Sequence, residues 1–168
     1  FGTASGLLDG TGDYIQTPDS ADFSVGNGNF TIDFWAKRNS FGTFQHICGQ
    51  CTSAGSYITN NVWFRDDNKI RLRYYNGSIN VEYVSTIAIT DTNWHHYALV
   101  RDSNTIRIFI DGVARGTGDC TGSTVYDSAQ PLVIGRIGSY ALEYFNGWID
   151  EFRFSKGVAR WTSDFTPP

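Results

Sequence analysis

The stretch that decides the fold is Phe30-Thr31-Ile32-Asp33-Phe34-Trp35-Ala36-Lys37. Its large apolar residues Phe30, Ile32 and Phe34 recur at every second position, with polar residues or Trp35 between them. Because successive side chains of a β-strand point to opposite faces of a sheet, this spacing predicts a strand with one face in a core. The same alternation recurs along most of the chain and helical periodicity is almost absent, which predicts an all-β protein.

Two further alternating segments end at strong turn sequences. Ile70–Tyr75 runs into Asn76-Gly77, and Thr105–Ile110 runs into Asp111-Gly112. Asn-Gly and Asp-Gly favour tight hairpin turns because both tolerate positive φ angles. Other strands are expected at residues 79–84, 94–101, 132–135 and 148–154. Short strands at such regular intervals are typical of a sandwich or a barrel.

Composition limits the class of protein further. The 168 residues include 12 Phe, 9 Tyr, 5 Trp and 18 Gly, and we expect them to form one domain over residues 1–168. A net charge of −4 with no basic stripe argues against nucleic-acid binding. No apolar run approaches the ~20 residues of a membrane helix. With no opening signal peptide, the chain is a mature product, an excised module or a segment of something larger.

Cys48, Cys51 and Cys120 form an odd set. The C-x-x-C spacing of Cys48 and Cys51 occurs in redox motifs and zinc sites, but no second such pair accompanies it and no helix is expected to follow. One structural disulfide is the simpler interpretation, and we favour Cys51 with Cys120, leaving Cys48 as a buried strand residue. Which cysteines pair cannot be deduced from the sequence, and the alternative that no disulfide forms stays open.

The order of these segments resembles laminin G-like domains of the concanavalin A-like superfamily. The matching segments are Leu8–Ile15, Phe30–Trp35, Trp94–Arg101, Ile108–Gly112, Ile134–Arg136 and Phe145–Phe154. The resemblance implies a jelly-roll sandwich of two antiparallel sheets with about six or seven strands each. The ending, residues 155–168, is similar to modules of phage tail and virion surface proteins, and also to bacterial secreted proteins.

The resemblance also implies a structural Ca²⁺ that ties the start of the first strand to the last strand. The matching positions are Asp9, Gly12, Asp13 and Asp150, where Gly12 would contribute its carbonyl. Hard cations such as calcium take oxygen ligands of this kind. The alternative is that Asp9 and Asp13 are simply turn residues.

Catalysis is not expected. Glycosidases on this fold carry a Glu-x-Asp-x-Glu strand that places two carboxylates on one face. Here Glu82, Glu143 and Glu151 belong to no such motif, and Asp150 and Glu151 would face opposite sides of a regular strand. The sequence therefore predicts a protein that is not an enzyme.

A sheet face that mixes aromatic residues with arginines suits sugars, since rings stack on apolar sugar faces and guanidinium groups bind hydroxyls or carboxylates. The candidate ligand-binding residues are Trp35, Trp63, Arg65, Arg71, Arg73, Tyr75 and Arg107. Their facing cannot be settled without strand register, so Trp35 could be a core residue and the arginines could pair with Asp. The loops at 52–61 and 116–127 are the other candidate site, which we rank slightly higher.

The first functional hypothesis is a non-catalytic recognition module that binds glycan and is displayed outside a cell or on a virion surface. The alternative is a structural virion protein, such as a capsid decoration or tail component, that acts through protein contacts and forms an oligomer or joins a larger assembly. Fold alone does not separate them.

Overall fold

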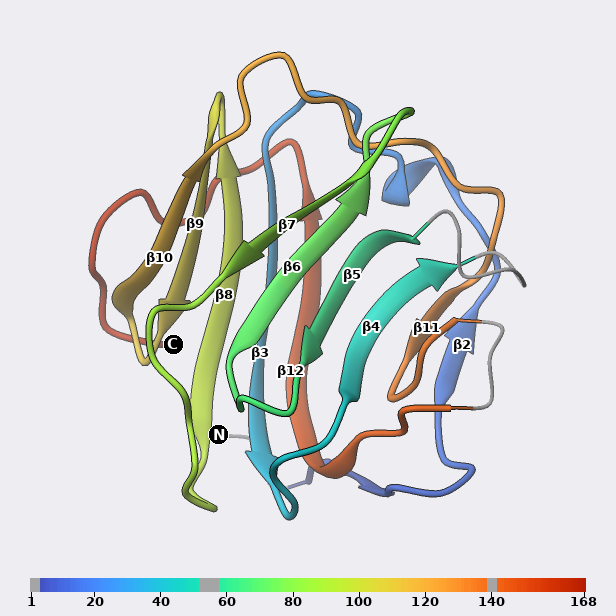
Figure 1. Cartoon of the computed structure of the whole chain (residues 1–168), viewed down its shortest axis with the longest axis vertical. Coiled ribbons are helices and arrows are strands. Elements are labelled where there is room, and N and C mark those ends of the chain that lie inside the picture. The colour runs from blue at the N-terminus through green and yellow to red at the C-terminus, as the bar shows by residue number, and fades with distance from the viewer. Residues whose placement is uncertain (1–3, 52–57, 139–141) are drawn as a thin grey trace.

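The computed structural model describes residues 4–51, 58–138 and 142–168. Two antiparallel sheets of six strands each face one another (Figure 1), as the sequence predicts for a jelly-roll sandwich. Sheet A has the order β1 (Gly6–Asp9), β12 (Asn146–Lys156), β3 (Phe30–Arg38), β8 (His95–Asp102), β9 (Thr105–Ile110) and β10 (Val113–Asp119). Sheet B has the order β2 (Ile15–Thr17), β11 (Leu132–Ile134), β4 (Gln45–Cys51), β5 (Ile58–Phe64), β6 (Ile70–Tyr75) and β7 (Asn80–Val84). A short 3₁₀ turn covers Ala21–Phe23.

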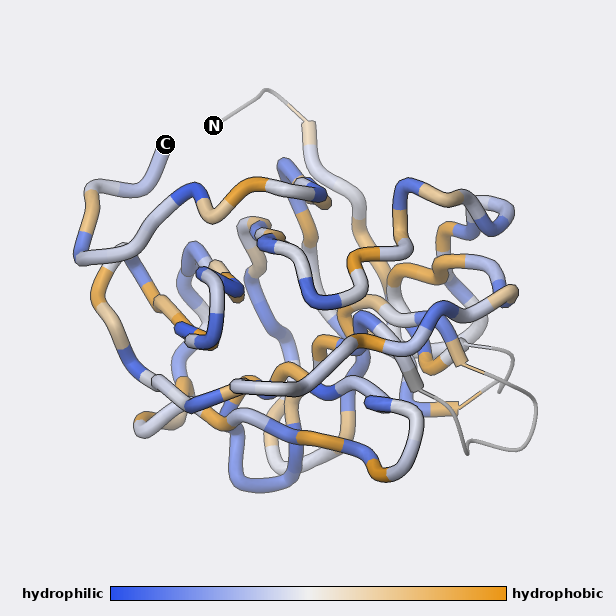
Figure 2. The backbone as a smooth tube through the Cα atoms, turned by 90° about the horizontal axis from the view of Figure 1, so that it is seen from above, coloured by the Kyte–Doolittle hydropathy of each residue, from blue (hydrophilic) through white to orange (hydrophobic). Residues whose placement is uncertain are grey.

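The core lies between the two sheets and is built by the predicted alternation. Phe30, Ile32 and Phe34 of β3 are all buried in it. Tyr97 of β8 joins the two layers, because its ring stacks on Phe34 at 5.4 Å and meets the edge of Phe64 from sheet B at 5.4 Å. Figure 2 shows the consequence along the backbone, where hydrophobic and hydrophilic residues alternate within the strands.

Both predicted hairpins are present. Asp111 and Gly112 have φ angles of 52° and 75°, the left-handed pair of a primed turn. In the other hairpin the Asn76 side chain accepts hydrogen bonds from the backbone N–H groups of Ser78 and Ile79. Gly112 is required for a second reason, since a Cβ there would lie 1.8 Å from the carbonyl oxygen of Phe165. The C-terminal segment thus depends on this turn for a close contact.

A bulge in β12 breaks the strict alternation of the last strand. Asp150 lies opposite Trp35, but Arg153 rather than residue 152 lies opposite Asp33, so β12 carries one extra residue. Glu151 takes this position with a φ of 50°. As a result Phe152 packs toward the core and Arg153 turns to the outer face. The expectation that Asp150 and Glu151 point to opposite faces rested on a regular strand and does not apply here.

The outer face of sheet A is covered by the end of the chain. Ala159, Trp161 and Phe165 pack against a small apolar cluster formed by Ala98, Val100 and Phe109. The rings of Trp161 and Phe165 are stacked with centroids 4.0 Å apart and planes at 7°. The C-terminal residues therefore act as a third layer over this part of sheet A.

The preferred disulfide between Cys51 and Cys120 is wrong. All three cysteines, which lie within the described residues, are buried thiols. Cys51 ends β4, whereas Cys120 follows β10, which contacts β7 across the sandwich. Three strand spacings separate β4 from β7, about 14 Å at the usual spacing within a sheet, while a disulfide needs Cα atoms within about 7 Å. Cys48 is a buried strand residue as expected, and burial raises the pKa of its thiol to about 12.

Replacement of Arg153 by Leu is expected to destabilise the fold by about 3 kcal/mol at neutral pH, because it leaves the buried Asp33 carboxylate without its cation. Arg153 donates from Nε and Nη2 to the two carboxylate oxygens at 3.0 and 2.7 Å. Burial alone would raise the pKa of Asp33, but the His96 ring, whose Nε2 lies 3.6 Å from Asp33 Oδ2, and the Arg153 guanidinium outweigh it and lower that pKa. The contribution is therefore present above the ordinary pKa of 3.8 and is lost as the pH falls through the lower folded value.

Urea unfolding checks this at neutral and acidic pH. The Arg153→Leu/Asp33→Leu double variant should be more stable than Arg153→Leu alone. Equal stability of the two variants would contradict the assignment of a buried ion pair.

His95 gives the fold a pH dependence of the opposite sign. Its ring nitrogens lie 2.7 Å from Asp111 Oδ2 and 3.1 Å from Asp91 Oδ1. Burial lowers the pKa of His95, but these carboxylates together raise it above 6.5. The stabilisation is fully present below the unfolded pKa of 6.5 and is lost as pH rises through the folded pKa. We expect His95→Gln to cost more stability at about pH 5 than at about pH 9 in thermal unfolding, and a cost that does not vary with pH would contradict it.

Candidate functional site

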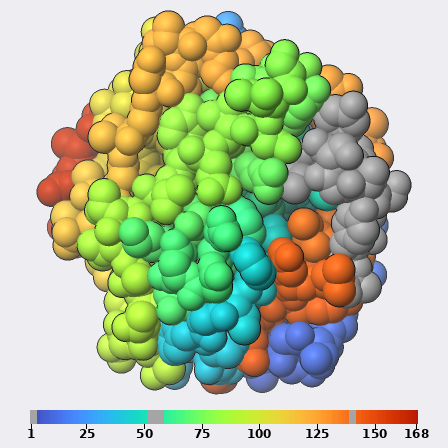
Figure 3. Space-filling view, in the orientation of Figure 1, coloured from blue at the N-terminus to red at the C-terminus, as the bar shows by residue number. Residues whose placement is uncertain are grey.

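Most of the predicted ligand-binding residues meet on the outer face of sheet B. The register places Trp63 of β5 beside Arg71 of β6, and Asn61 beside Arg73 in the next row. This face is turned toward the viewer in Figure 3, with β5–β7 in green next to β4 in cyan. The predicted residues gathered here are Trp63, Arg65, Arg71, Arg73 and Tyr75.

Trp35 and Arg107 do not join them. Both belong to strands of sheet A and face away from the core on the opposite side of the molecule. The Trp35 ring meets the edge of His96 at 5.3 Å, and Arg107 pairs with Asp102 at 3.1 Å. The prediction that Trp35 and Arg107 point away from the core is correct, but β3 and β9 belong to sheet A.

Trp63 is not an open stacking platform. Its ring is parallel within 17° to that of Phe44 at 5.6 Å and to that of His46 at 5.2 Å, and the residue is only 7% exposed. Phe44 is the exposed ring of this group, at 37%. Phe44 and His46 were not among the predicted residues. Their spacing of two residues at the start of β4 indicates that their side chains share one face of the strand.

Arg71 has a structural role on this face. It donates to both carboxylate oxygens of Asp67 at 2.8 and 2.6 Å and from Nε to Glu82 at 3.2 Å. The hydrogen bond from Arg71 lowers the pKa of Asp67 to about 2, and the carboxylates in turn raise the pKa of Arg71. The alternative that the arginines pair with acidic residues is therefore correct for Arg71.

His46 and Arg73 form the next part of the face. His46 Nδ1 lies 3.0 Å from Glu143 Oε2. Burial lowers the pKa of His46, and the positive charge of Arg73 adds to this while Glu143 opposes it. Within the described residues, Arg73 itself makes no ion pair or side-chain hydrogen bond.

Buried polar atoms without partners lie beside Arg73. Asn61 is 1% exposed, yet neither its Oδ1 nor its Nδ2 has a hydrogen-bond partner in the described part of the chain, and the same holds for Trp63 Nε1. A Cβ at residue 49 would lie 2.7 Å from Asn61 Oδ1, so the lack of a side chain at Gly49 makes space for the Asn61 amide itself. Because buried polar groups are almost always hydrogen-bonded, these unsatisfied atoms single out this part of the face.

The proposed calcium ligands do not converge. Asp9 and Asp13 lie in one turn, where Asp9 Oδ1 accepts from the Thr11 N–H at 2.7 Å and Asp13 Oδ2 from the Asp9 N–H at 3.2 Å. Asp9 lies opposite Asn146, so Asp150 is four residues farther along β12, about 13 Å at the usual rise per residue. Within the described residues, no three acidic, His or Cys side chains gather in a cluster of the kind that holds a metal. Asp9, Gly12, Asp13 and Asp150 therefore do not fit one ion.

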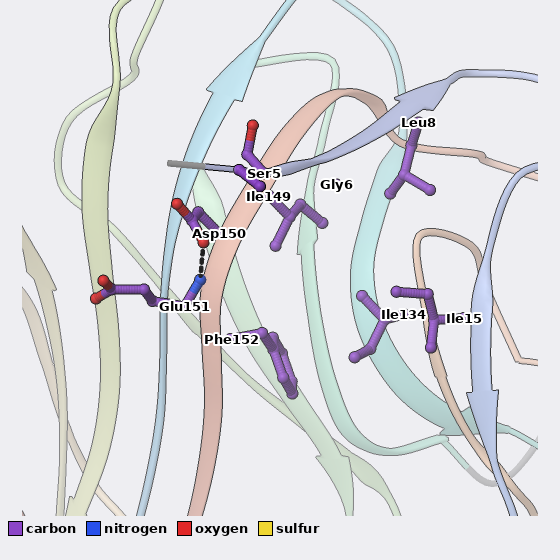
Figure 4. Close-up of a pocket in the computed structure, with 10 residues that line it drawn as sticks. Ser5, Gly6, Leu8, Ile15, Ile134, Ile149, Asp150, Glu151 and Phe152 are labelled. Atoms are coloured by element: carbon purple, nitrogen blue, oxygen red, sulfur yellow. Dashed lines mark hydrogen bonds between the residues drawn. The ribbon is translucent and has the colours of Figure 1, made fainter. Parts of the chain in front are cut away.

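Asp150 instead borders an apolar cavity of about 340 Å³ between the edges of the two sheets. Figure 4 shows Ile15, Ile134 and Leu8 on one side of it and Asp150 with Glu151 at the other end. The Asp150 carboxylate accepts a hydrogen bond from the Glu151 N–H at 2.8 Å. The walls of this cavity are mostly apolar and offer few polar groups for a sugar, in contrast to the outer face of sheet B.

The family model for the concanavalin A-like lectin/glucanases superfamily, of the laminin G type, matches residues 9–162. The chain belongs to this superfamily. Comparison with curated protein sequences finds no match. In the part of the chain that the structure describes, no helix is long and apolar enough to cross a membrane.

Solved structures agree with the sandwich. Domains LG4-5 of the mouse laminin alpha1 chain match with a TM-score of 0.69 at 17% identity, covering 90% of this chain and 40% of that one. A putative carbohydrate binding protein from Bacteroides ovatus matches with 0.71 at 19%, covering 94% and 44%. The Ruminococcus gnavus IT-sialidase CBM40, bound to α2,3 sialyllactose, matches with 0.67 at 13%, covering 93% and 92%. The chain thus spans less than half of the first two, and these identities establish the fold alone.

Because Asp150 lies far from Asp9 and Asp13, we expect Asp150→Asn to leave any calcium effect on stability unchanged. The measurement is the thermal midpoint with millimolar calcium and with chelator, for the wild type and the variant. A calcium-induced shift that disappears in Asp150→Asn but persists in Asp13→Asn would place the ion at Asp150 and contradict this expectation.

Proposed function

We propose that the protein is a non-catalytic glycan-binding module whose binding surface is the outer face of sheet B. The observation that carries the proposal is a group of polar atoms on this face. Asn61 and Trp63 Nε1 are buried without a hydrogen-bond partner in the described residues, and Arg73 beside them makes no ion pair there. Burying such groups without hydrogen bonds is costly. A ligand rich in hydroxyl groups would satisfy donors and acceptors together.

The chemistry of the face suits a sugar ring. The Arg73 guanidinium offers planar donors at the surface, and the buried Asn61 amide lies beside it. The exposed Phe44 ring offers an apolar face of the kind on which the C–H face of a sugar packs. Beside these groups, Arg71 of β6 binds Asp67 and also Glu82 of β7, which ties the two strands together.

The carboxylates of this face are unsuited to acid–base work on a sugar. Glu82 is bound to Arg71, and Glu143 lies against His46. A general acid or base must reach the sugar oxygen with which it exchanges a proton, and both carboxylates are engaged with protein groups instead. This supports a binding role rather than a catalytic one.

The comparisons are compatible with this proposal, since two of the similar structures are described as a putative carbohydrate binding protein and a carbohydrate-binding module. We extend to this chain only the general role of binding glycan. We propose that the module acts outside a cell. Display on a virion, and the alternative role as a structural virion protein, stay predictions from sequence.

Arg73→Ala and Asn61→Ala should each weaken binding roughly tenfold to a hundredfold, the value of one to two lost hydrogen bonds at a buried or charged group. The measurement is a glycan array on the wild type, followed by calorimetry with the best sugar. Arg107→Ala removes the same side chain from the outer face of sheet A and should bind like the wild type.

Equal loss in Arg107→Ala would contradict the placement on sheet B. Absence of any sugar binding by the folded wild type, together with ordered oligomers in size-exclusion chromatography, would contradict the proposed function and favour the virion alternative.

A further inference from the structure

A second, polar cavity lies at one end of the sandwich, away from sheet B's outer face. It measures about 290 Å³ and is formed where three turns meet, at the top in Figure 1. The residues that line it are Asn27, Arg101, Ser103, Asn104, Gly122, Ser123 and Thr124. The sequence had marked the loop at 116–127 as a candidate binding region, and its second half supplies one wall.

Arg101 forms the buried wall of this cavity and is 1% exposed. Its Nε donates to the Ser103 carbonyl at 3.1 Å, Nη1 to Gly26 at 3.2 Å and Nη2 to Ser123 at 2.7 Å. These partners are neutral backbone carbonyls that hold the three turns together. A guanidinium has five N–H groups, so these bonds leave donor capacity unused.

The charge of Arg101 has no partner among the described residues. The neighbouring carboxylates are engaged elsewhere, Asp102 with Arg107 at 3.1 Å and Asp119 with the Thr121 hydroxyl at 2.6 Å. Neither of them lines the cavity. A buried cation that no anion balances is unfavourable, and this one borders an open, polar space.

We propose that this cavity is a binding site for an oxyanion group, a carboxylate or a sulfate, with Arg101 as its cation. Thr124 and Asn104 line the space and carry a hydroxyl and an amide that can donate, while the Ser123 hydroxyl accepts a hydrogen bond from Tyr74 at 3.1 Å. The volume is at the lower end for small-ligand sites, which suits one charged group on a small molecule or on a single sugar unit. The site is independent of the glycan surface on sheet B.

The test places a competing carboxylate in the cavity without disturbing Arg101, whose removal would also loosen three turns. Thr124→Asp puts an acid at the exposed rim of the cavity. Thr92→Asp makes the same charge change at an exposed position outside it. Folded ¹⁵N-labelled wild type and both variants are titrated by NMR with sodium sulfate and with sodium acetate at constant ionic strength.

The wild type and Thr92→Asp should show saturable shifts at the amides of Gly122 and Ser123, and Thr124→Asp should bind roughly tenfold more weakly or not at all. Saturation by sulfate, acetate or both identifies which oxyanion the site takes. Shifts that do not saturate in the wild type, or equal binding by Thr124→Asp, would overturn the proposal. Arg73→Ala should retain this response, so failure of the sheet B proposal is seen separately.

Discussion

The ion pair between Asp33 and Arg153 is the constraint on which sheet A depends. Asp33 lies in β3, one of the two middle strands of sheet A, and Arg153 reaches it only because Glu151 adds one residue to β12. The bulge turns Phe152 and Phe154 toward the core and the arginine toward the outer face. A charged group this deeply buried tolerates only one register, since a slip would leave the carboxylate without its cation.

The same outer face is then closed by the C-terminal residues. Trp161 and Phe165 meet the edges of His96 and cover Phe109, and the Phe165 N–H bonds to Gly112 at the hairpin turn. The two outer faces of the sandwich are therefore unlike. Part of the outer face of sheet A is covered by its own chain, whereas the outer face of sheet B has an exposed ring and buried polar atoms that lack partners in the described residues. That asymmetry explains why binding is assigned to sheet B.

Prediction of which residues share a face succeeded within strands and failed between them. Arg71, Arg73 and Tyr75 were correctly placed on one face of β6, because alternation is set by the geometry of a single strand. Trp35 and Arg107 alternate as expected in β3 and β9, but these strands pair within the other sheet. Asn61, the most informative polar residue, carries no local signal, since its importance comes from lacking a partner in three dimensions.

The sequence by itself determined the all-β class, the core face of β3 and the two hairpins, because these follow from side-chain alternation and from residues that tolerate positive φ. Only the tertiary structure decided which strands share a sheet, the distance of Asp150 from Asp9, the separation of Cys51 from Cys120 and the uncompensated charge of Arg101. Each of these depends on contacts between residues distant in the chain. Such contacts are set by strand pairing and bulges, which no local pattern encodes.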